Sequence, residues 1–163
     1  MAAVIKPILP DIGLANWQDC VMHGLEGTSQ TWKVGAPLIN SSGYLVEATT
    51  ATTGYAGAII GFSLAPASGT NGTDVLFVPV IPTLCFSGTV DGTLVATNAP
   101  GTGSLAQSGM WGGLGLQKDA ASGYWFLCTT GTASFIAVAA IDPVATVNGR
   151  VRVQILRAQT LLI

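Results

Sequence analysis

The stretch from residue 134 to residue 156 constrains the fold of this chain more than any other, because it predicts two β-strands. Residues 134–141 are apolar and partly β-branched, a composition that favours a strand. Asp142-Pro143 ends this strand, since proline has no N–H to donate to a strand ladder. Residues 150–157 predict the second strand, because polar and apolar side chains alternate at its start.

The second strand has two chemically different faces. Arg150, Arg152 and Gln154 point to one side, and the apolar residues between them point to the other. The register of this strand must be firm, because a slip of one residue would bury two arginines. We expect the arginines either to be solvated or to pair with carboxylates of a neighbouring chain.

Turn signals recur along the rest of the chain about every 8 to 12 residues, a spacing typical of β-sandwiches and β-barrels. Short runs between the turns predict strands at residues 31–34, 36–39, 44–48, 56–64, 74–81, 83–88, 114–117 and 124–128. The last two runs predict a hairpin, and residues 40–43 predict a turn. We therefore expect an all-β fold, a small β-barrel or a β-sandwich.

Residues 1–28 differ from the rest of the chain, with two prolines, the only histidine and no alternating pattern. They predict an extended N-terminal arm with a short helical turn near residues 16–22. Arms of this kind become ordered against a neighbouring chain. The alternative is a terminal strand folded back on its own domain. With an arm, residues 29–163 form the all-β domain, which carries a long loop near residues 98–110.

Charged residues make up only 9% of the chain, against about 25% in an average domain. A surface with so few charges is weakly solvated, which favours an oligomer or a larger assembly. The alternative is a monomer with a polar but uncharged surface. Six Lys and Arg residues are too few for a basic stripe, so no nucleic-acid partner is expected.

No membrane-spanning helix and no targeting segment are expected from the sequence. The chain has no run of about 18 apolar residues, the length that a spanning helix needs. Pro7 and Pro10 interrupt the apolar start, which is too short for a secretion signal. No membrane partner is therefore predicted.

We find no motif for catalysis or for a cofactor. Catalysis needs a positioned base or nucleophile with a partner, and the only histidine, His23, lies in the predicted arm. Cys20 and His23 supply only half of a metal site, because no second pair stands at a usable spacing. We therefore expect no catalytic residue, no metal and no cofactor.

The three cysteines, Cys20, Cys85 and Cys128, are widely spaced. An odd number of cysteines without a signal segment favours reduced thiols. A disulfide between Cys85 and Cys128 is the alternative, because both lie in strand-like apolar runs.

The tryptophans are the largest candidate anchors. Trp125 lies in a predicted strand and is expected in the core, and Trp32 opens another and is expected at the end of a barrel. Trp111 follows the predicted long loop. It is a candidate for a partner contact, because interface cores favour tryptophan, and packing in the chain's own core is the alternative.

Three stretches together resemble the capsid decoration, or cement, proteins of tailed bacteriophages. They are Trp32–Leu38 with Gly43–Ala48, Ala58–Leu64 with Val75–Val80, and Ala140–Pro143 with Val147–Val151. The likeness spans about residues 30–157 and consists of turns and strand patterns. Residues 1–28 and the loop at 98–109 fall outside it.

The resemblance implies a small all-β protein with a β-barrel or β-tulip-like domain. Such proteins form homodimers or homotrimers on the outside of an expanded icosahedral shell of the HK97 type. There they bind the major capsid protein and clamp neighbouring capsomers against the pressure of the packaged DNA. The resemblance thus predicts a structural virion protein, made in the host cytoplasm and located on the outer capsid surface, with no catalytic residues.

Two other functions stay open from the sequence. One is another virion component, such as a head-fibre, tail or receptor-binding module, and the other is a small β-barrel hydrolase. For the decoration protein, we expect contacts with the capsid or with another subunit at Ile5, Pro7, Ile8, Leu9, Trp17, Trp111, Arg150 and Arg152.

Overall fold

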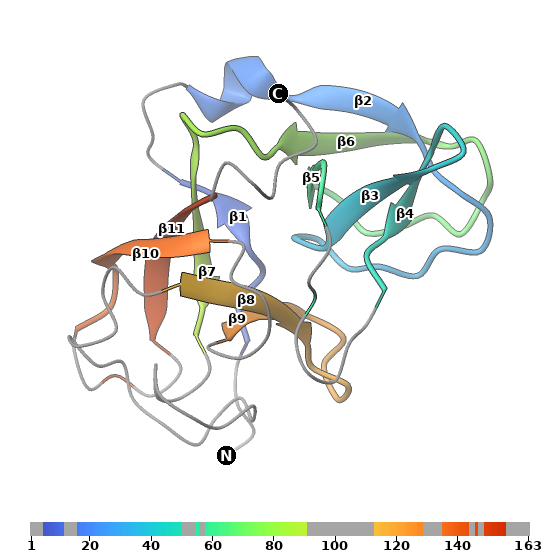
Figure 1. Cartoon of the computed structure of the whole chain (residues 1–163). Coiled ribbons are helices and arrows are strands. Elements are labelled where there is room, and N and C mark those ends of the chain that lie inside the picture. Colours follow the sequence, from blue (N-terminus) through green and yellow to red (C-terminus); the bar gives the residue numbers. More distant parts are fainter. Residues whose placement is uncertain are drawn as a thin grey trace.

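The structure is a computed structural model, and it describes residues 5–11, 16–49, 55, 58–90, 113–128, 135–143, 146 and 149–155. These residues form two β-sheets and one short 3-10 helix (Figure 1). The elements are β1 (Leu9–Pro10), η1 (Trp17–Cys20), β2 (Met22–Leu25), β3 (Pro37–Ser41), β4 (Tyr44–Glu47), β5 (Gly61–Ser63), β6 (Asp74–Pro79), β7 (Cys85–Thr89), β8 (Gly113–Lys118), β9 (Trp125–Cys128), β10 (Phe135–Ala140) and β11 (Arg150–Ile155). The predicted all-β class is confirmed. Within the described residues, no helix is long and apolar enough to cross a membrane.

One sheet has six strands in the order β1-β7-β11-β10-β8-β9. β10 and β11 pair antiparallel, with Phe135 opposite Ile155, so the two strands predicted between residues 134 and 156 are neighbours. β11 also pairs with β7, with Arg150 opposite Thr89. Its apolar residues are buried and its polar residues are partly exposed, as the alternation predicts. β8 and β9 form the predicted hairpin.

The other sheet has five strands in the order β2-β6-β5-β3-β4. β3 and β4 form a hairpin whose turn residues Ser42 and Gly43 have φ values of 53° and 88°. Two successive positive φ values are typical of a type I′ turn, whose twist matches that of the flanking strands. The side chain of Asn40 accepts a hydrogen bond from Gly43 N–H at 3.1 Å. The turn predicted at residues 40–43 is therefore confirmed.

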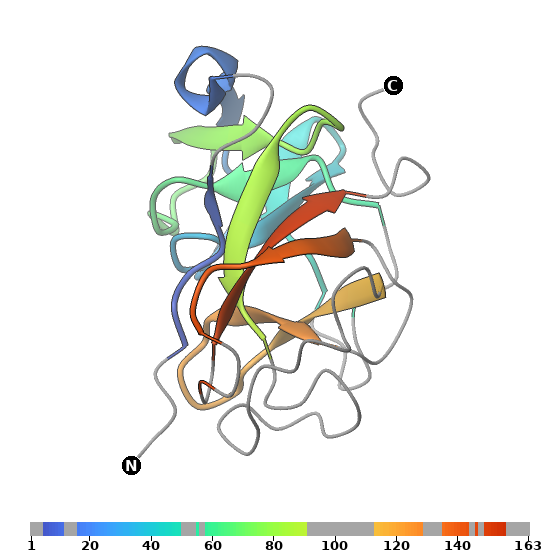
Figure 2. The same ribbon diagram turned by 90° about the vertical axis from the view of Figure 1, so that its left-hand side faces the viewer.

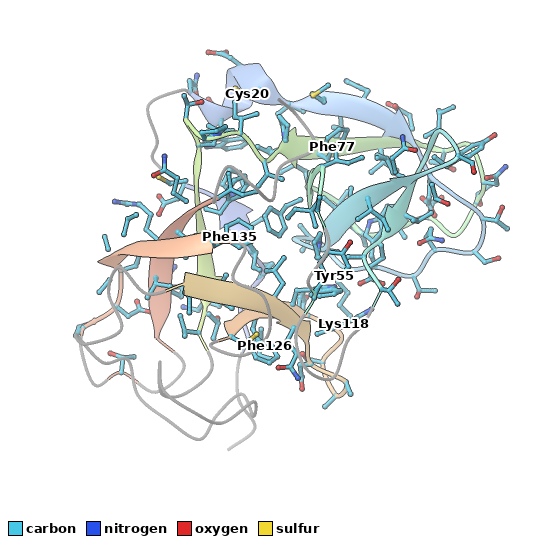
Figure 3. The ribbon with its side chains drawn as sticks, viewed as in Figure 1. Cys20, Tyr55, Phe77, Lys118, Phe126 and Phe135 are labelled. Atoms are coloured by element: carbon cyan, nitrogen blue, oxygen red, sulfur yellow. The ribbon has the colours of Figure 1, made fainter. Side chains whose placement is uncertain are left out.

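The two sheets pack face to face, and aromatic side chains fill the layer between them. Figure 3 shows Phe77 and Phe135 in this layer. The ring centroid of Phe62 on β5 lies 4.9 Å from that of Phe86 and 5.9 Å from that of Phe135. Burial of each such side chain contributes roughly 1.5–3 kcal/mol. This aromatic contact therefore joins the two sheets into one core.

The described strands form two separate sheets and do not close into a barrel. Of the two predicted architectures, the β-sandwich is therefore the one observed. The two ends of the five-stranded sheet nevertheless meet at one parallel bridge between Glu26 and Leu45. Leu45 O accepts a hydrogen bond from Gly27 N–H at 2.8 Å. A Cβ at Gly24 would lie only 2.5 Å from Leu45 Cδ1, so β2 passes close to β4. The sheet is strongly curled, without a continuous ladder between its end strands.

Two predicted strands differ from the observed ones. Residues 31–34 form an irregular segment and a turn, because Trp32 turns inward and its indole N–H donates to Ala65 O at 3.2 Å. Trp32 is fully buried in the core that the two sheets share. In the described part of the run predicted at residues 56–64, which is residues 58–64, the strand is β5. Trp125 is buried, as predicted.

The N-terminal segment contributes to both sheets. β1 pairs antiparallel with β7, and Figure 2 shows this segment (dark blue) running beside β7. β2 pairs antiparallel with β6. Between them lies η1, inside the range predicted for a helical turn, with the side chain of Asn16 accepting a hydrogen bond from Gln18 N–H. Over its described residues the segment is folded back on its own domain, which is the alternative to the predicted arm.

Candidate functional site

Two of the predicted contact residues, Ile5 and Ile8, lie inside the chain. Their exposed fractions are 6% and 0%. A Cβ at Gly88 on β7 would lie 3.1 Å from Ile8 Cγ1, which shows how closely β1 packs on that strand. The prediction that these two isoleucines contact another chain is corrected, because their apolar side chains complete the chain's own core.

Three further predicted contact residues are only partly buried. Pro7 and Leu9 flank the buried Ile8, and Trp17 on η1 packs with part of its side chain against the core. Part of each side chain stays exposed, so contact of these three residues with a partner stays a prediction. Trp111 and the predicted loop at residues 98–110 lie outside the described residues.

Arg150 pairs with a carboxylate of its own chain. Its guanidinium donates two hydrogen bonds to Asp142, from Nε at 3.2 Å and from Nη2 at 3.0 Å. Asp142 also accepts a hydrogen bond from the backbone N–H of Arg150 at 2.9 Å. The hydrogen bond from the Arg150 side chain is the main cause that lowers the pKa of Asp142 below its usual value. Asp142, which follows the end of β10, therefore anchors the start of β11.

Asp142→Asn is expected to lower the free energy of unfolding by about 1 kcal/mol at neutral pH, because the pair is partly exposed and screened by solvent. The pKa of Asp142 is lower in the folded than in the unfolded chain, so the stabilisation is complete above its unfolded pKa. It is lost as the pH falls through the lower, folded value. Urea titrations at neutral and at strongly acidic pH measure this, and an undiminished difference in acid would contradict the assignment.

Arg152 pairs with the N-terminal segment of its own chain. Its Nε donates to Asp11 Oδ2 at 3.0 Å. The thiol of Cys85 lies beside this pair, and burial raises its pKa, while Arg152 lowers it and Asp11 raises it. Both arginines therefore pair within the chain, and each side chain stays partly exposed, at 33% for Arg150 and 30% for Arg152. Contact of these residues with another chain stays a prediction.

A second polar cluster joins the two sheets at Glu47 on β4. Its carboxylate accepts hydrogen bonds from Lys118 Nζ on β8 and from the indole N–H of Trp125 on β9, both at 2.8 Å. The charged side chains are largely buried, with exposed fractions of 13% for Glu47 and 19% for Lys118. Trp125 also makes an edge-to-face contact with Tyr55 at 6.4 Å. This cluster holds β4 against the β8–β9 hairpin, so its role is structural.

Glu26 is a fully buried carboxylate that directs the loop before β6. Its side chain accepts hydrogen bonds from Ser68 N–H at 2.8 Å and from Gly69 N–H at 2.7 Å. Its backbone also bonds to the loop, donating to Thr73 O and accepting from Gly72 N–H, each at 2.8 Å. Glu26 therefore supplies hydrogen-bond partners to backbone groups of a loop that is not part of a strand.

Glu26→Ala is expected to lower the free energy of unfolding by about 2–3 kcal/mol, because two backbone donors lose a charged acceptor. Glu26→Gln keeps one carbonyl oxygen and should cost less than the alanine variant. Equilibrium unfolding in urea compares the three proteins. Equal stability of wild type and Glu26→Ala would show that water satisfies both donors.

His23 lies on β2 and contacts a carboxylate on the neighbouring strand. Its Nδ1 lies 2.8 Å from Asp74 Oδ2, and the exposed fractions of the two side chains are 65% and 60%. Cys20 is the last residue of η1, which comes just before β2 in the chain. Among the described residues, no three His, Cys, Asp or Glu side chains gather in a group that could hold a metal ion.

The large apolar side chains that stay exposed all belong to the five-stranded sheet. Among the described residues these are Met22 and Leu25 on β2, Tyr44 on β4 and Leu76 on β6. In the β2–β6 pairing, His23 stands opposite Leu76 and Leu25 opposite Asp74. Residues opposite each other in two paired strands point to the same side of the sheet. The exposed side chains of these two opposite pairs therefore share one face. We call the face made by His23, Leu25, Asp74 and Leu76 the β2–β6 surface.

Comparison of the chain with protein families, curated proteins and solved structures found no match.

The three cysteines form no disulfide, so the Cys85–Cys128 bridge considered as an alternative is not observed. Cys85 lies on β7 and Cys128 on β9, which are not neighbours in the six-stranded sheet.

The β2–β6 surface was not predicted from the sequence. β2 has the sequence Met-His-Gly-Leu and shows no alternation, because both its faces are largely exposed and period-2 patterns arise only where one face is buried. The sequence of β6 gives a clearer indication of an exposed apolar residue. Val75 and Phe77 face the core, so Leu76 between them points to the opposite, exposed face of the sheet.

Proposed function

We propose that this chain is a structural protein of a virus particle, which binds the outside of an icosahedral phage capsid and stabilises it. The partner is the major capsid protein, and the chain acts by clamping neighbouring capsomers. The resemblance of residues 30–157 to capsid decoration proteins supports this function. The observed all-β sandwich is compatible with it.

The observation that carries the proposal is the concentration of exposed apolar side chains on one sheet. Exposed apolar clusters on a folded domain mark interaction sites. Three of the cations that the structure describes, Lys118, Arg150 and Arg152, pair with carboxylates of the same chain. A partner that covers the exposed apolar side chains therefore does not have to desolvate these three charges. Weak contacts of this type gain strength when many copies bind one shell.

Copy number in purified virus particles tests the proposal. Quantitative mass spectrometry should count the chain in hundreds of copies, in a fixed ratio to the major shell protein. A handful of copies per particle would indicate a tail, fibre or vertex component, and absence from particles would overturn the structural function.

Binding to empty shells provides a second test. Purified full-length protein added to expanded shells that lack it should bind to a fixed stoichiometry and raise the temperature at which the shells disassemble. Unexpanded shells serve as the matched control. Equal binding to both shell forms, or no change in disassembly temperature, would contradict a clamping role.

A further inference from the structure

The loop between β5 and β6 contains an asparagine that is followed by a glycine, at positions 71 and 72. Asn71 and Gly72 are both exposed to solvent. In such a dipeptide the backbone nitrogen of the glycine can attack the side-chain amide of the asparagine, because glycine has no Cβ to crowd the approach. Asn71 is therefore chemically able to lose its side-chain amide.

This reaction proceeds in two steps and consumes one water molecule. The nitrogen of Gly72 loses its proton and forms a bond to Cγ of Asn71, while the side-chain nitrogen of Asn71 leaves as ammonia. A five-membered succinimide ring remains. Water then opens the ring at one of its two carbonyl carbons and gives aspartate or isoaspartate. Both products add one negative charge, and isoaspartate also adds one carbon atom to the main chain.

The folded turn around this dipeptide opposes ring formation. Thr73 N–H donates to Thr70 O at 3.3 Å across a turn whose central residues are Asn71 and Gly72. Only Gly72 of these two has a positive φ, at 81°, which is typical of a type II turn. Such a turn holds the peptide plane between its central residues in one orientation. Ring formation has to rotate this plane, because the Gly72 nitrogen must approach Cγ of Asn71.

The backbone of Glu26 restrains the attacking nitrogen directly. Gly72 N–H donates to Glu26 O at 2.8 Å. Rotation of the peptide plane would break this hydrogen bond. The bond also favours the protonated nitrogen, because a hydrogen bond made by the neutral form of a group disfavours its charged form. Glu26 therefore opposes both the movement and the deprotonation that the reaction requires.

The carboxylate of Glu26 restrains the rest of the same loop. It accepts hydrogen bonds from Ser68 N–H at 2.8 Å and from Gly69 N–H at 2.7 Å, and Glu26 is fully buried. The hydroxyl of Ser68 then donates to Thr73 Oγ1 and accepts from Thr70 N–H, each at 3.0 Å. Ser68 thus links the carboxylate to both ends of the turn that holds the dipeptide.

We propose that Asn71 is a site of spontaneous deamidation and that Glu26 sets the rate of this reaction by holding the loop at residues 68–73. Isoaspartate at position 71 lengthens the main chain inside this loop, so the modified loop no longer fits its hydrogen bonds to Glu26. Deamidation then weakens the attachment of the loop to the end of β2 and is not reversed by the protein. The inference goes beyond the proposed function and does not depend on it.

Peptide mapping by mass spectrometry tests the proposal on the full-length chain, incubated in buffer and in concentrated urea. Asn148-Gly149 is the same dipeptide and serves as an internal reference. In urea the two asparagines should deamidate at equal rates. In buffer, Asn71 of the wild type should react at least about tenfold more slowly than in urea, because the reaction requires local opening of the loop. Glu26→Ala should raise the rate at Asn71 in buffer about tenfold above wild type.

Ile8→Ala is the matched control, because it removes buried side-chain atoms from the core and changes no residue of the loop. Its rate at Asn71 should stay within about twofold of wild type. Glu26→Gln, which keeps one carbonyl oxygen, should give an intermediate rate, and circular dichroism establishes that each variant is folded. Equal acceleration by Glu26→Ala and Ile8→Ala would show that global unfolding sets the rate and would overturn the role of Glu26. An intact Asn71 in urea, or a wild-type rate in buffer as fast as in urea, would also overturn the inference.

Discussion

Deleting residues 1–28 is expected to leave a chain that does not fold. The deletion removes β1 and β2, one strand from each sheet, together with the buried side chain of Ile8 and the carboxylate of Glu26. Loss of one large buried aliphatic side chain costs about 2–5 kcal/mol. A domain of this kind is stabilised by only about 5–15 kcal/mol in total, so the combined losses exceed what it can bear. Circular dichroism and solubility of the truncated chain provide the measurement.

Single substitutions in the same segment give a graded version of this result. Ile8→Ala should lower the free energy of unfolding by about 3 kcal/mol, because the cavity would lie under β7. Leu9→Ala, at the neighbouring and only partly buried position, should cost less than about 1 kcal/mol. A folded, soluble chain after deletion of residues 1–28 would instead show that this segment is a separable arm.

Gly61→Ala is expected to lower the free energy of unfolding by at least about 3 kcal/mol. Gly61 begins β5 and stands opposite Pro79 of β6. A Cβ at this position would lie 2.3 Å from Val78 O and 2.6 Å from Phe77 Cδ2. The carbonyl belongs to the backbone of a paired strand and cannot rotate away, so β5 and β6 would have to separate. Urea or thermal unfolding measures the loss.

Gly72→Ala is the matched control for that prediction. Gly72 has a φ of 81°, and no atom lies within 4 Å of the Cβ that alanine would add. Its cost should therefore be the backbone strain alone, about 1–2 kcal/mol. If both variants lost equal stability, the close approach of β5 and β6 would not be the reason that glycine is needed at position 61.

The local pattern was sufficient where one face of a strand is buried and the other is exposed. Residues 150–155 alternate without exception, and β11 has buried and partly exposed residues in that order. The β3–β4 turn was also predictable, because Ser42 and Gly43 follow an asparagine whose side chain can close the turn. In both cases the pattern that allows the prediction lies within a few consecutive residues of the chain.

The candidate site was predicted less well, because its residues are assembled across the sheets. Arg152 and Asp11 are 141 residues apart in sequence, and no spacing rule links them. The same holds for His23 and Asp74, which are 51 residues apart. Ile8 was predicted as a partner contact for the same reason, since an apolar residue between prolines gives no sign of which sheet it will cover.

The sequence by itself determined the all-β class, the position of several strands and turns, and the scarcity of charge, because these depend on local side-chain chemistry. The tertiary structure decided that the N-terminal segment belongs to both sheets, that the arginines pair within the chain, and which apolar side chains stay outside. Burial and ion pairing depend on which strands become neighbours, and that order is set by the packing of the whole core.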